Sequence, residues 1–236
     1  MKTFNYYKKI IREILKGLIF KYTNLWNPSY PYWLEPCQLA FLVNEISSTK
    51  NIDGCLLEIG VARGMTTKFL CEHIVKENIN VKYYAMDTFR SFDIADMKFE
   101  VDERGKILED IYAFDFNDLD VFRQKFKDYD FIEVIKSDCK EFDYSKIGPI
   151  KIVLLDVDLY LPTKVALQKI YPLLVTGGVI LCDNVCHKDH VYDGAKQAYD
   201  EFCDENNLEK HYFGNMSGVI RANGINNNIH TNINNT

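Results

Sequence analysis

Acidic side chains follow two apolar runs in the second half of the chain. Asp156 and Asp158 come directly after one run, and Asp183 and Asn184 come directly after the next. The carboxyl ends of neighbouring parallel strands lie about 5 Å apart, and carboxylates at that distance repel and raise one another's pKa. A divalent cation such as Mg²⁺, which prefers oxygen ligands, relieves this repulsion. The pattern predicts a metal site at Asp156, Asp183 and Asn184, and simple capping of the turn by Asp183 and Asn184 is the alternative.

Cysteine and histidine residues surround Asp183 and Asn184 and raise the alternative of zinc. Cys182 precedes Asp183, and Cys186, His187 and His190 follow it. Strand alternation directs Cys182 away from Asp183, and no second cysteine pair completes a tetrahedral site, so zinc is not expected. His187 or His190 is instead a candidate catalytic base reaching in from the loop, and a solvent-exposed loop histidine is the plainer interpretation of each.

A glycine-containing turn follows an earlier apolar run. Residues 58–64 read E-I-G-V-A-R-G, which is E-x-G-x-x-x-G and not the G-x-G-x-x-G dinucleotide fingerprint. Glycines there let a ligand approach the backbone, and the free N–H groups of the following helix suit a carboxylate. We expect a cofactor loop, and a plain strand–turn–helix joint is the alternative. The candidate cofactor contacts are Glu58, Gly60, Ala62, Arg63, Gly64 and Thr66.

Two further strand ends carry acids that suit an adenosine group. Asp87 stands 27 positions after the first glycine of that loop, where a carboxylate accepts both ribose hydroxyls; capping of the next segment is the alternative. Ser137 and Asp138 end another apolar run, where an acid meets the exocyclic amine of an adenine. Thr88 and Asp156 complete the candidate cofactor contacts.

Together these motifs resemble those of class I S-adenosylmethionine-dependent O-methyltransferases. The likeness is to the macrocin O-methyltransferase family, which acts on sugar hydroxyls of natural products and related glycans. It covers roughly residues 36–221, and its motifs lie at 58–64, 86–89, 155–160 with Thr163, 177–184 and 194–198. The resemblance implies S-adenosylmethionine as methyl donor and a divalent metal held by Asp156, Asp183 and Asn184, with Asp158 as the general base.

One position departs from the family pattern. That family usually has two aspartates after the fifth strand, whereas this chain has Asp183 and Asn184. An Asp-Asp-Asn set is instead similar to catechol and caffeoyl-CoA O-methyltransferases, which commonly place a catalytic lysine shortly after the first aspartate. No lysine follows Asp156 before Lys164. The expected function is therefore metal-dependent methylation of a sugar hydroxyl on a glycan, nucleotide sugar or glycosylated metabolite, with a catechol or caffeoyl-CoA-type enzyme as the alternative.

In the expected mechanism, the metal chelates two vicinal hydroxyls and lowers the pKa of the reacting one. Asp158, or a loop histidine such as His187, removes the proton. A nicotinamide-dependent oxidoreductase is disfavoured by the missing dinucleotide fingerprint and the acidic cluster. A non-catalytic adenosyl-binding protein is disfavoured because acids are intact at three strand ends.

The elements that must position these residues alternate between strand and helix. This alternation predicts an α/β fold, a doubly wound, Rossmann-like sheet of seven mostly parallel strands with a closing antiparallel hairpin. Strands are expected at 55–59, 81–86, 131–135, 151–155, 179–182, 211–213 and 218–221, and helices at 36–47, 66–76, 162–174 and 193–205. The polar excursion 88–117 and the aromatic connector 26–33 are the expected walls for the acceptor.

The chain is expected to comprise an N-terminal helical segment with its connector (1–50), the methyltransferase domain (51–221) and an asparagine-rich, disordered tail (222–236). Apolar residues at helical spacing predict an amphipathic helix over 4–22, rich in lysine and arginine. Packing on the domain or on a partner chain is the plain interpretation of this helix, and contact with an anionic membrane surface is the alternative. A homo-oligomer stays open.

Composition narrows the partners. A net charge of −6 argues against a protein that binds long polyanions such as nucleic acids, so a small-molecule or glycan substrate is expected. No apolar stretch reaches the ~18 to 20 residues of a spanning helix, and charged residues interrupt the N-terminus where a signal peptide would be apolar. Seven scattered cysteines without a C-x-x-C pair predict reduced thiols in a cytoplasmic protein.

Overall fold

The computed structural model describes residues 2–25, 29–186 and 190–222. The chain divides into two compact units, Met1–Trp33 and Leu34–Thr236. The first unit contains helix α1 (Lys2–Tyr22). The helix expected from Pro36 lies in the second unit, so the structure places the boundary before this helix and not near residue 50. Apart from Ala222, the expected disordered tail lies outside the described residues.

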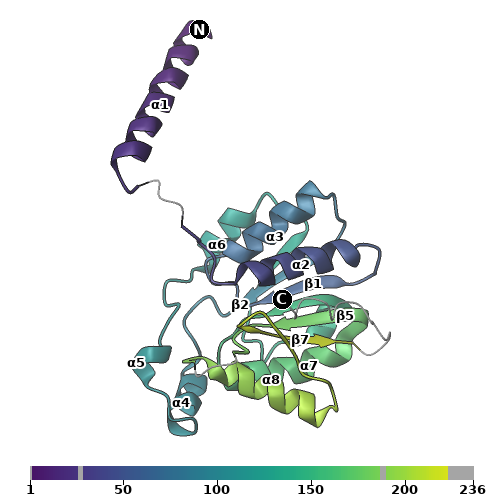
Figure 1. Cartoon of the computed structure of the whole chain (residues 1–236). Coiled ribbons are helices and arrows are strands. Elements are labelled where there is room, and N and C mark those ends of the chain that lie inside the picture. Colours follow the sequence, from purple (N-terminus) through teal and green to yellow (C-terminus); the bar gives the residue numbers. More distant parts are fainter. Residues whose placement is uncertain (1, 26–28, 187–189, 223–236) are drawn as a thin grey trace, which may run out of the picture. The chain divides into compact units, whose positions relative to one another are not determined.

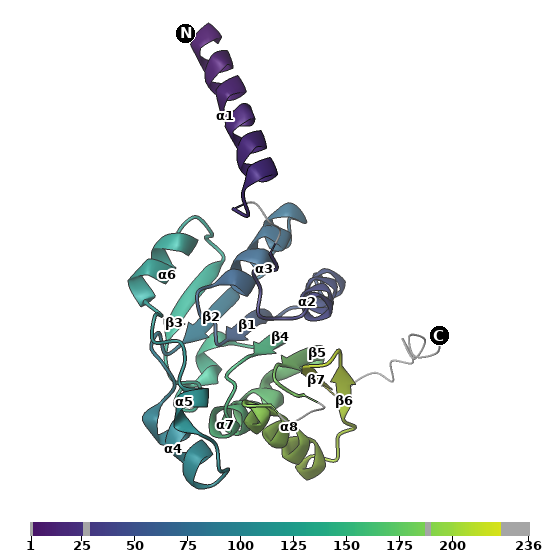
Figure 2. The same cartoon turned by 60° about the vertical axis from the view of Figure 1, so that its left-hand side comes forward.

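The second unit is built on a seven-stranded sheet of order β3-β2-β1-β4-β5-β7-β6 (Figure 2). The first five strands are parallel, β7 is antiparallel to β5, and β6 is antiparallel to β7. The expected α/β fold with a closing hairpin is thereby confirmed. The strands are β1 (Cys55–Ile59), β2 (Tyr83–Asp87), β3 (Ile132–Lys136), β4 (Ile150–Leu155), β5 (Leu174–Cys182), β6 (His211–Phe213) and β7 (Ser217–Arg221).

Helices cover both faces of this sheet. In Figures 1 and 2, α2, α3 and α6 lie on one face and α7 and α8 on the other. The helices are α2 (Pro36–Ser48), α3 (Met65–Lys76), α4 (Ile94–Asp102), α5 (Leu108–Ile111), α6 (Leu119–Phe126), α7 (Tyr160–Ile170) and α8 (Asp193–Glu205), with 3₁₀ turns at Tyr144–Ile147 and Tyr171–Leu173. Because both faces are covered, the central strands β1 and β4 are buried along their whole length.

The direction in which successive strands are added to the sheet reverses between β1 and β4. Strands β2 and β3 extend the sheet on one side of β1, while β4 and β5 extend it on the other. In open α/β sheets, ligands bind outside the carboxyl ends of the strands at such a switch point. The glycine turn after β1 and Asp156 after β4 flank this point.

Strand β5 begins earlier than its apolar run predicts. The two glycines expected to form a turn lie inside the strand, and Gly177 has a φ of +80°. The pairing with β4 moves from Ile150–Leu174 to Ile152–Val179, so β5 bulges between these pairs. Helix α7 ends at Ile170, four residues before the expected end, and a 3₁₀ turn over Tyr171–Leu173 that contains Pro172 follows it.

The polar excursion between β2 and β3 contains helices that the periodicity analysis did not identify. Helix α4 begins after Asp93, whose side chain accepts a hydrogen bond from the Ala95 N–H at 2.9 Å. Helix α6 begins after Asp118, which caps the Val121 N–H in the same way at 2.8 Å. Each aspartate satisfies an N–H group that has no partner within its own helix.

Candidate active site

The turn after β1 needs glycine at its first position because it passes close to the end of β4. Gly60 has a φ of +87°, and a Cβ atom there would overlap the carbonyl oxygen of Asp156 and lie 2.7 Å from its carbonyl carbon. Gly64 has a φ of +82° and would place a Cβ atom 2.7 Å from the ring of Phe126. The two glycines therefore allow a tight turn that connects β1 to the first residue of α3.

The remaining predicted residues of this turn have mixed surroundings. Ala62 has a φ of +44° and is half-buried, as is Thr66 in the first turn of α3, while Arg63 is exposed. Thr88 follows the neighbouring strand β2 and donates a hydrogen bond to the Arg90 carbonyl at 3.0 Å. Their contacts with a cofactor stay predictions.

Glu58 points into the protein and not toward solvent. Its carboxylate accepts hydrogen bonds from the Thr67 hydroxyl at 2.7 Å and from the Tyr83 hydroxyl. Burial raises the pKa of Glu58 to about 7, and these two donors act in the opposite direction. In this arrangement Glu58 connects β1 to α3 and β2, and its expected contact with the cofactor stays a prediction.

Asp87 holds the glycine turn from the end of β2. One carboxylate oxygen accepts hydrogen bonds from the N–H groups of Val61 and Ala62 at 2.9 and 3.1 Å, and the other accepts from Phe89 at 2.7 Å. Burial raises the pKa of Asp87, while these hydrogen bonds lower it. The sequence predicted a partner for ribose hydroxyls; the structure shows the same carboxylate fixing the loop, and the ribose contact stays a prediction.

The end of β3 carries an ion-pair network. Asp138 accepts a hydrogen bond from the Lys140 N–H at 2.8 Å and pairs with its ammonium group at 3.2 Å. The same ammonium binds Asp96 of α4. Ser137 donates its backbone N–H to the Asp87 carbonyl at 3.0 Å. Lys140, which the motifs did not single out, therefore links the end of β3 to the excursion.

The structure brings the four predicted polar residues after β4 and β5 together. Asp158, Asp183 and Asn184 are buried and Asp156 is half-buried. Burial raises the pKa of Asp156, Asp158 and Asp183, and the charge of Asp183 raises the pKa of Asp156 and Asp158 further. Asp156 and Asp183 share a hydrogen bond, and the Asn184 amide donates to Asp158. The four residues thus lie together at this edge of the sheet, and their role as metal ligands stays a prediction.

Two members of this cluster have backbone conformations that side-chain-bearing residues rarely adopt. Asp158 has a φ of +62° and Asn184 has a φ of +58°. At Asp158 the chain forms a three-residue turn, in which the Leu159 N–H donates to the Val157 carbonyl at 2.6 Å. Such conformations cost roughly 1 to 3 kcal/mol and are concentrated at functional sites.

Gln38 completes the cluster from α2. It is fully buried, and its amide donates to the Asp183 carboxylate. Its carbonyl oxygen accepts the Glu35 N–H at 2.5 Å, which is half of a capping box at the start of α2. Sequence reasoning did not find Gln38; the detectable signal was a capping-box glutamine three positions after Glu35.

A buried charged network attaches α4 beside the cluster. Glu100 of α4 is 1% exposed and accepts the Tyr160 N–H at 2.7 Å, at the first residue of α7. Its second oxygen accepts the Arg104 guanidinium at 2.7 Å, and Arg104 also binds Asp193 of α8 at 2.6 Å. Lys106 pairs with Asp193 at 2.7 Å. This network was not identified from the sequence.

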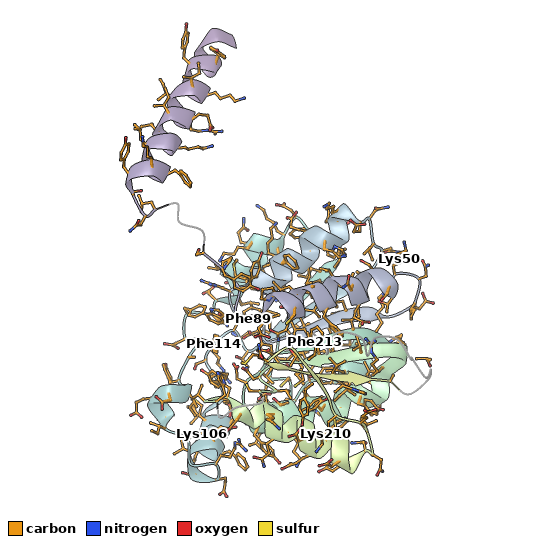
Figure 3. All side chains as sticks on the ribbon, viewed as in Figure 1. Lys50, Phe89, Lys106, Phe114, Lys210 and Phe213 are labelled. Carbon is orange, nitrogen blue, oxygen red and sulfur yellow. The ribbon has the colours of Figure 1, made fainter. Side chains whose placement is uncertain are left out.

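Aromatic side chains from the same excursion lie near the strand ends. Phe92 contacts Phe114 and Tyr192, with ring centroids 5.4 and 6.1 Å apart. Phe89 packs against Phe122 of α6 at 5.3 Å. Figure 3 shows Phe89 and Phe114 on the side of the second unit where α4 and α5 lie. This placement agrees with the excursion as a wall for the acceptor, which stays a prediction.

The structure also shows the surroundings of the predicted metal site and of His190. Within residues 2–25, 29–186 and 190–222, no group of three or more His, Cys, Asp or Glu side chains is arranged to hold a metal ion. All seven cysteines are free thiols, and Cys182 is buried in the core. His190 accepts the Tyr192 N–H at 3.2 Å, and His187 lies outside the described residues.

Known proteins share the fold of the second unit. Among solved structures, the O-methyltransferase NovP has a TM-score of 0.62 at 18% identity over 78% of each chain. The calicheamicin methyltransferase CalS11 also has a TM-score of 0.62, at 19% identity over 90% of this chain and 91% of its own. A second structure of CalS11, described as a TDP-rhamnose 3'-O-methyltransferase, has a TM-score of 0.56 at 16% identity over 90% and 93%.

A Streptococcus mutans protein solved with SAH has a TM-score of 0.51 at 16% identity over 80% of this chain and 99% of its own. At these identities the structures show a shared fold.

No curated protein matches the chain by sequence. The model of the macrocin O-methyltransferase (TylF) family matches residues 37–214, from α2 through β6. This match spans the glycine turn, the acidic cluster and Gln38, and the chain therefore belongs to the macrocin O-methyltransferase family.

Proposed function

We propose that this protein transfers a methyl group from S-adenosylmethionine to a hydroxyl group of a sugar, with Asp158 as the general base. The observation that carries the proposal is the pair of Asp158 and Asn184. Both have positive φ, at the ends of neighbouring strands, and the Asn184 amide donates to Asp158. The family supports the reaction class, and the description of CalS11 as acting on a nucleotide sugar supports the acceptor class.

The turn after β1 is the proposed site for the methyl donor. Gly60 lets the turn approach the end of β4, and the Asp87 carboxylate fixes the N–H groups of Val61 and Ala62. S-adenosylmethionine, when bound, supplies an activated methyl group, so the protein's contribution is alignment and exclusion of water. In this proposal the Asp87 carboxylate accepts additional hydrogen bonds from the ribose hydroxyl groups.

Asp158 is suited to remove a proton from the acceptor hydroxyl. Burial and the neighbouring Asp183 raise its pKa, which brings this carboxylate closer to the working pH of a general base. The Asn184 amide fixes the orientation of its Oδ1 atom. Glu100 holds the Tyr160 N–H two residues later, so the turn that carries Asp158 is anchored at the start of α7.

A divalent metal fits the chemistry of the donor set. Asp156, Asp183 and Asn184 offer hard oxygen ligands. Burial raises the pKa of both carboxyl groups, and the charge of Asp183 raises that of Asp156 further. We propose that these three residues would hold Mg²⁺, which would lower the pKa of a bound hydroxyl. In the described arrangement Asp156 and Asp183 instead share a hydrogen bond, so the metal would replace a proton.

The base is tested by Asp158→Asn, with exposed Asp130→Asn as the matched control. Loss of the base lowers kcat by roughly 10² to 10⁴-fold, while binding of S-adenosylhomocysteine, measured by calorimetry, changes little. Transfer of a labelled methyl group is measured with nucleotide sugars, glycosides and catechols as acceptors. A wild-type rate in Asp158→Asn would contradict the assignment of the base.

The metal is tested by thermal unfolding in EDTA and in Mg²⁺. Mg²⁺ is expected to raise the unfolding temperature of the wild type, because ligands stabilise the state that binds them, and Asp183→Asn is expected to lose most of this increase. If the wild type shows no shift and methylates normally in EDTA, the metal is excluded from the proposal.

A catechol-type acceptor is the second candidate. The feature that favours it is Asn184, which makes the set Asp-Asp-Asn. Turnover of catechols and none of nucleotide sugars or glycosides in the same acceptor panel would replace the sugar proposal with this one.

A further inference from the structure

Helix α1 lies outside the part of the chain that defines the family. The family match begins at residue 37, whereas α1 ends at Tyr22 and belongs to the separate unit Met1–Trp33. The residues of the polar cluster at the strand ends all belong to the second unit. The family match therefore assigns no role to α1.

The apolar side of α1 is broad and exposed within its own unit. At about 100° per residue, the large apolar residues cover roughly half of the helix circumference. Their exposed fractions run from 38% for Ile10 to 62% for Tyr6. A face this wide is typical of a helix lying in the plane of a membrane interface, whereas a two-stranded coiled coil needs only a narrow seam. The apolar face consists of Tyr6, Tyr7, Ile10, Ile11, Ile14, Leu15 and Leu18.

The opposite side of α1 is basic. Lys8, Lys9, Arg12 and Lys16 fall within an arc of about 100°, and Glu13, which pairs with Lys16 at 2.9 Å, is the only acid in the helix. Six basic residues against one acid give residues 1–33 a net charge of +5. Because the whole chain carries −6, the remaining residues carry −11.

This charge distribution identifies the kind of surface that complements the helix. A second copy of α1 carries the same +5, so two such helices repel each other and have no acidic partners for interhelical ion pairs. An anionic lipid surface attracts the basic side chains and accepts the apolar face between its headgroups. The acidic second unit would be repelled by the same surface, so contact is confined to α1.

We propose that α1 docks the enzyme onto the surface of an anionic lipid bilayer. The helix lies in the interface with Ile11, Ile14 and Leu18 toward the acyl chains and with Lys8, Arg12 and Lys16 among the headgroups. It does not cross the bilayer: no helix in the described part of the chain is long and apolar enough to span one. The proposal stands on α1 alone and does not depend on the acceptor of the methyl group.

The test is co-sedimentation of the full chain with vesicles of phosphatidylcholine alone or mixed with phosphatidylglycerol. The wild type is expected to sediment with the anionic vesicles and to be released by salt. The variant Lys8→Gln/Arg12→Gln/Lys16→Gln is expected to partition about 100-fold more weakly, because each basic residue near the surface contributes about a factor of five. Glutamine preserves helix propensity.

The matched control removes three exposed lysines from the second unit. Lys50→Gln/Lys76→Gln/Lys127→Gln changes the net charge equally, and all three positions are exposed. Lys50 lies at the opposite end of the sheet from Phe89 (Figure 3). This control is expected to partition like the wild type; an equal loss in both triple variants would show a general charge effect and overturn the proposal.

The variant Ile14→Gln/Leu18→Gln, which changes the apolar face, distinguishes the bilayer from two other partners: a second copy of the chain and the chain itself. It is expected to lose vesicle binding while its mass in light scattering stays that of the wild type. If the wild type ignores anionic vesicles and this variant changes the mass, a second copy covers the face and the proposal is wrong. If vesicle binding is absent and the variant instead lowers the unfolding temperature, α1 packs on its own chain, and the proposal is again wrong.

Discussion

Replacing Glu100 by glutamine tests whether the buried network holds α4 in place. The substitution keeps an oxygen to accept the Tyr160 N–H but turns an amide N–H group toward the Arg104 guanidinium, which now meets a donor. The side chains of Glu100 and Arg104 are 2% and 11% exposed, so water does not replace the lost partner.

The expected cost follows from what Arg104 keeps. Breaking a buried ion pair by removing one partner costs roughly 3 to 5 kcal/mol, and a hydrogen bond to a charged group contributes about 1.5 to 3 kcal/mol. Arg104 retains Asp193 at 2.6 Å, which reduces the penalty. We therefore expect Glu100→Gln to lower the free energy of unfolding by about 3 kcal/mol.

Urea unfolding measures this change. With a slope of about 3 kcal/mol per molar urea, the midpoint is expected to fall by about 1 M. Glu103→Gln makes the same chemical change at an exposed position next to α4, and it is expected to stay within about 0.5 kcal/mol of the wild type. Equal midpoints for both variants would refute a stabilising role for the network.

A double-mutant cycle then separates the pair from its surroundings. Arg104→Gln alone also leaves a buried charge without its partner, whereas Glu100→Gln/Arg104→Gln removes both charges. The double variant is expected to be less unstable than the sum of the single changes, by about 1 to 3 kcal/mol. Strict additivity would show that the two side chains act independently despite their 2.7 Å contact.

Two further predictions concern the turn after β1. Because the folded pKa of Glu58 is about 7 and its ordinary value is 4.5, its contribution to stability is present below about pH 4.5 and is lost as the pH rises through 7. Glu58 is expected to contribute a fall of about 2.5 kcal/mol in the free energy of unfolding between pH 5 and pH 8, and Glu58→Gln should remove this share of the slope in urea titrations. An unchanged slope would assign the whole pH dependence to other groups such as Asp158 and Asp183, whose pKa values are also raised. Gly60→Ala places a methyl group onto the Asp156 carbonyl, whereas Gly105, with a φ of +68°, has open space around it. Gly105→Ala is expected to cost about 1 to 2 kcal/mol from the backbone alone and Gly60→Ala distinctly more, and equal costs would remove the close approach as the reason for this glycine.

The sheet could be predicted from the sequence because its central strands are buried on both faces. The run that became β4 is almost entirely apolar, which is typical of a covered parallel strand. The start of β5 could not be predicted in this way. Its pairing jumps from Leu174 to Val179 across a bulge, and only the contact with β4 fixes that register. A strand interrupted by two glycines carries the same local signal as a turn.

The acidic cluster was predictable for a related reason, since parallel strands bring their carboxyl ends to one edge. The partners that hold the cluster were not. Gln38 is one of several polar residues in α2, and it contacts Asp183 across 145 positions. Glu100 lies in a charged helix whose pattern indicates a solvated surface, yet it is 1% exposed. Long-range hydrogen bonds leave no periodic signal in either segment.

The hydrogen bond between Gln38 and Asp183 also sets a timetable for biosynthesis. A ribosome adding about 5 to 20 residues per second needs roughly 7 to 30 s to extend the chain by the 145 positions between them. During that interval α2 has emerged, but the acid that it will hold has not been made. A truncated product that stops before β5 therefore retains the glycine turn and lacks Asp183 and Asn184. The complete site can form only after most of the chain has been made.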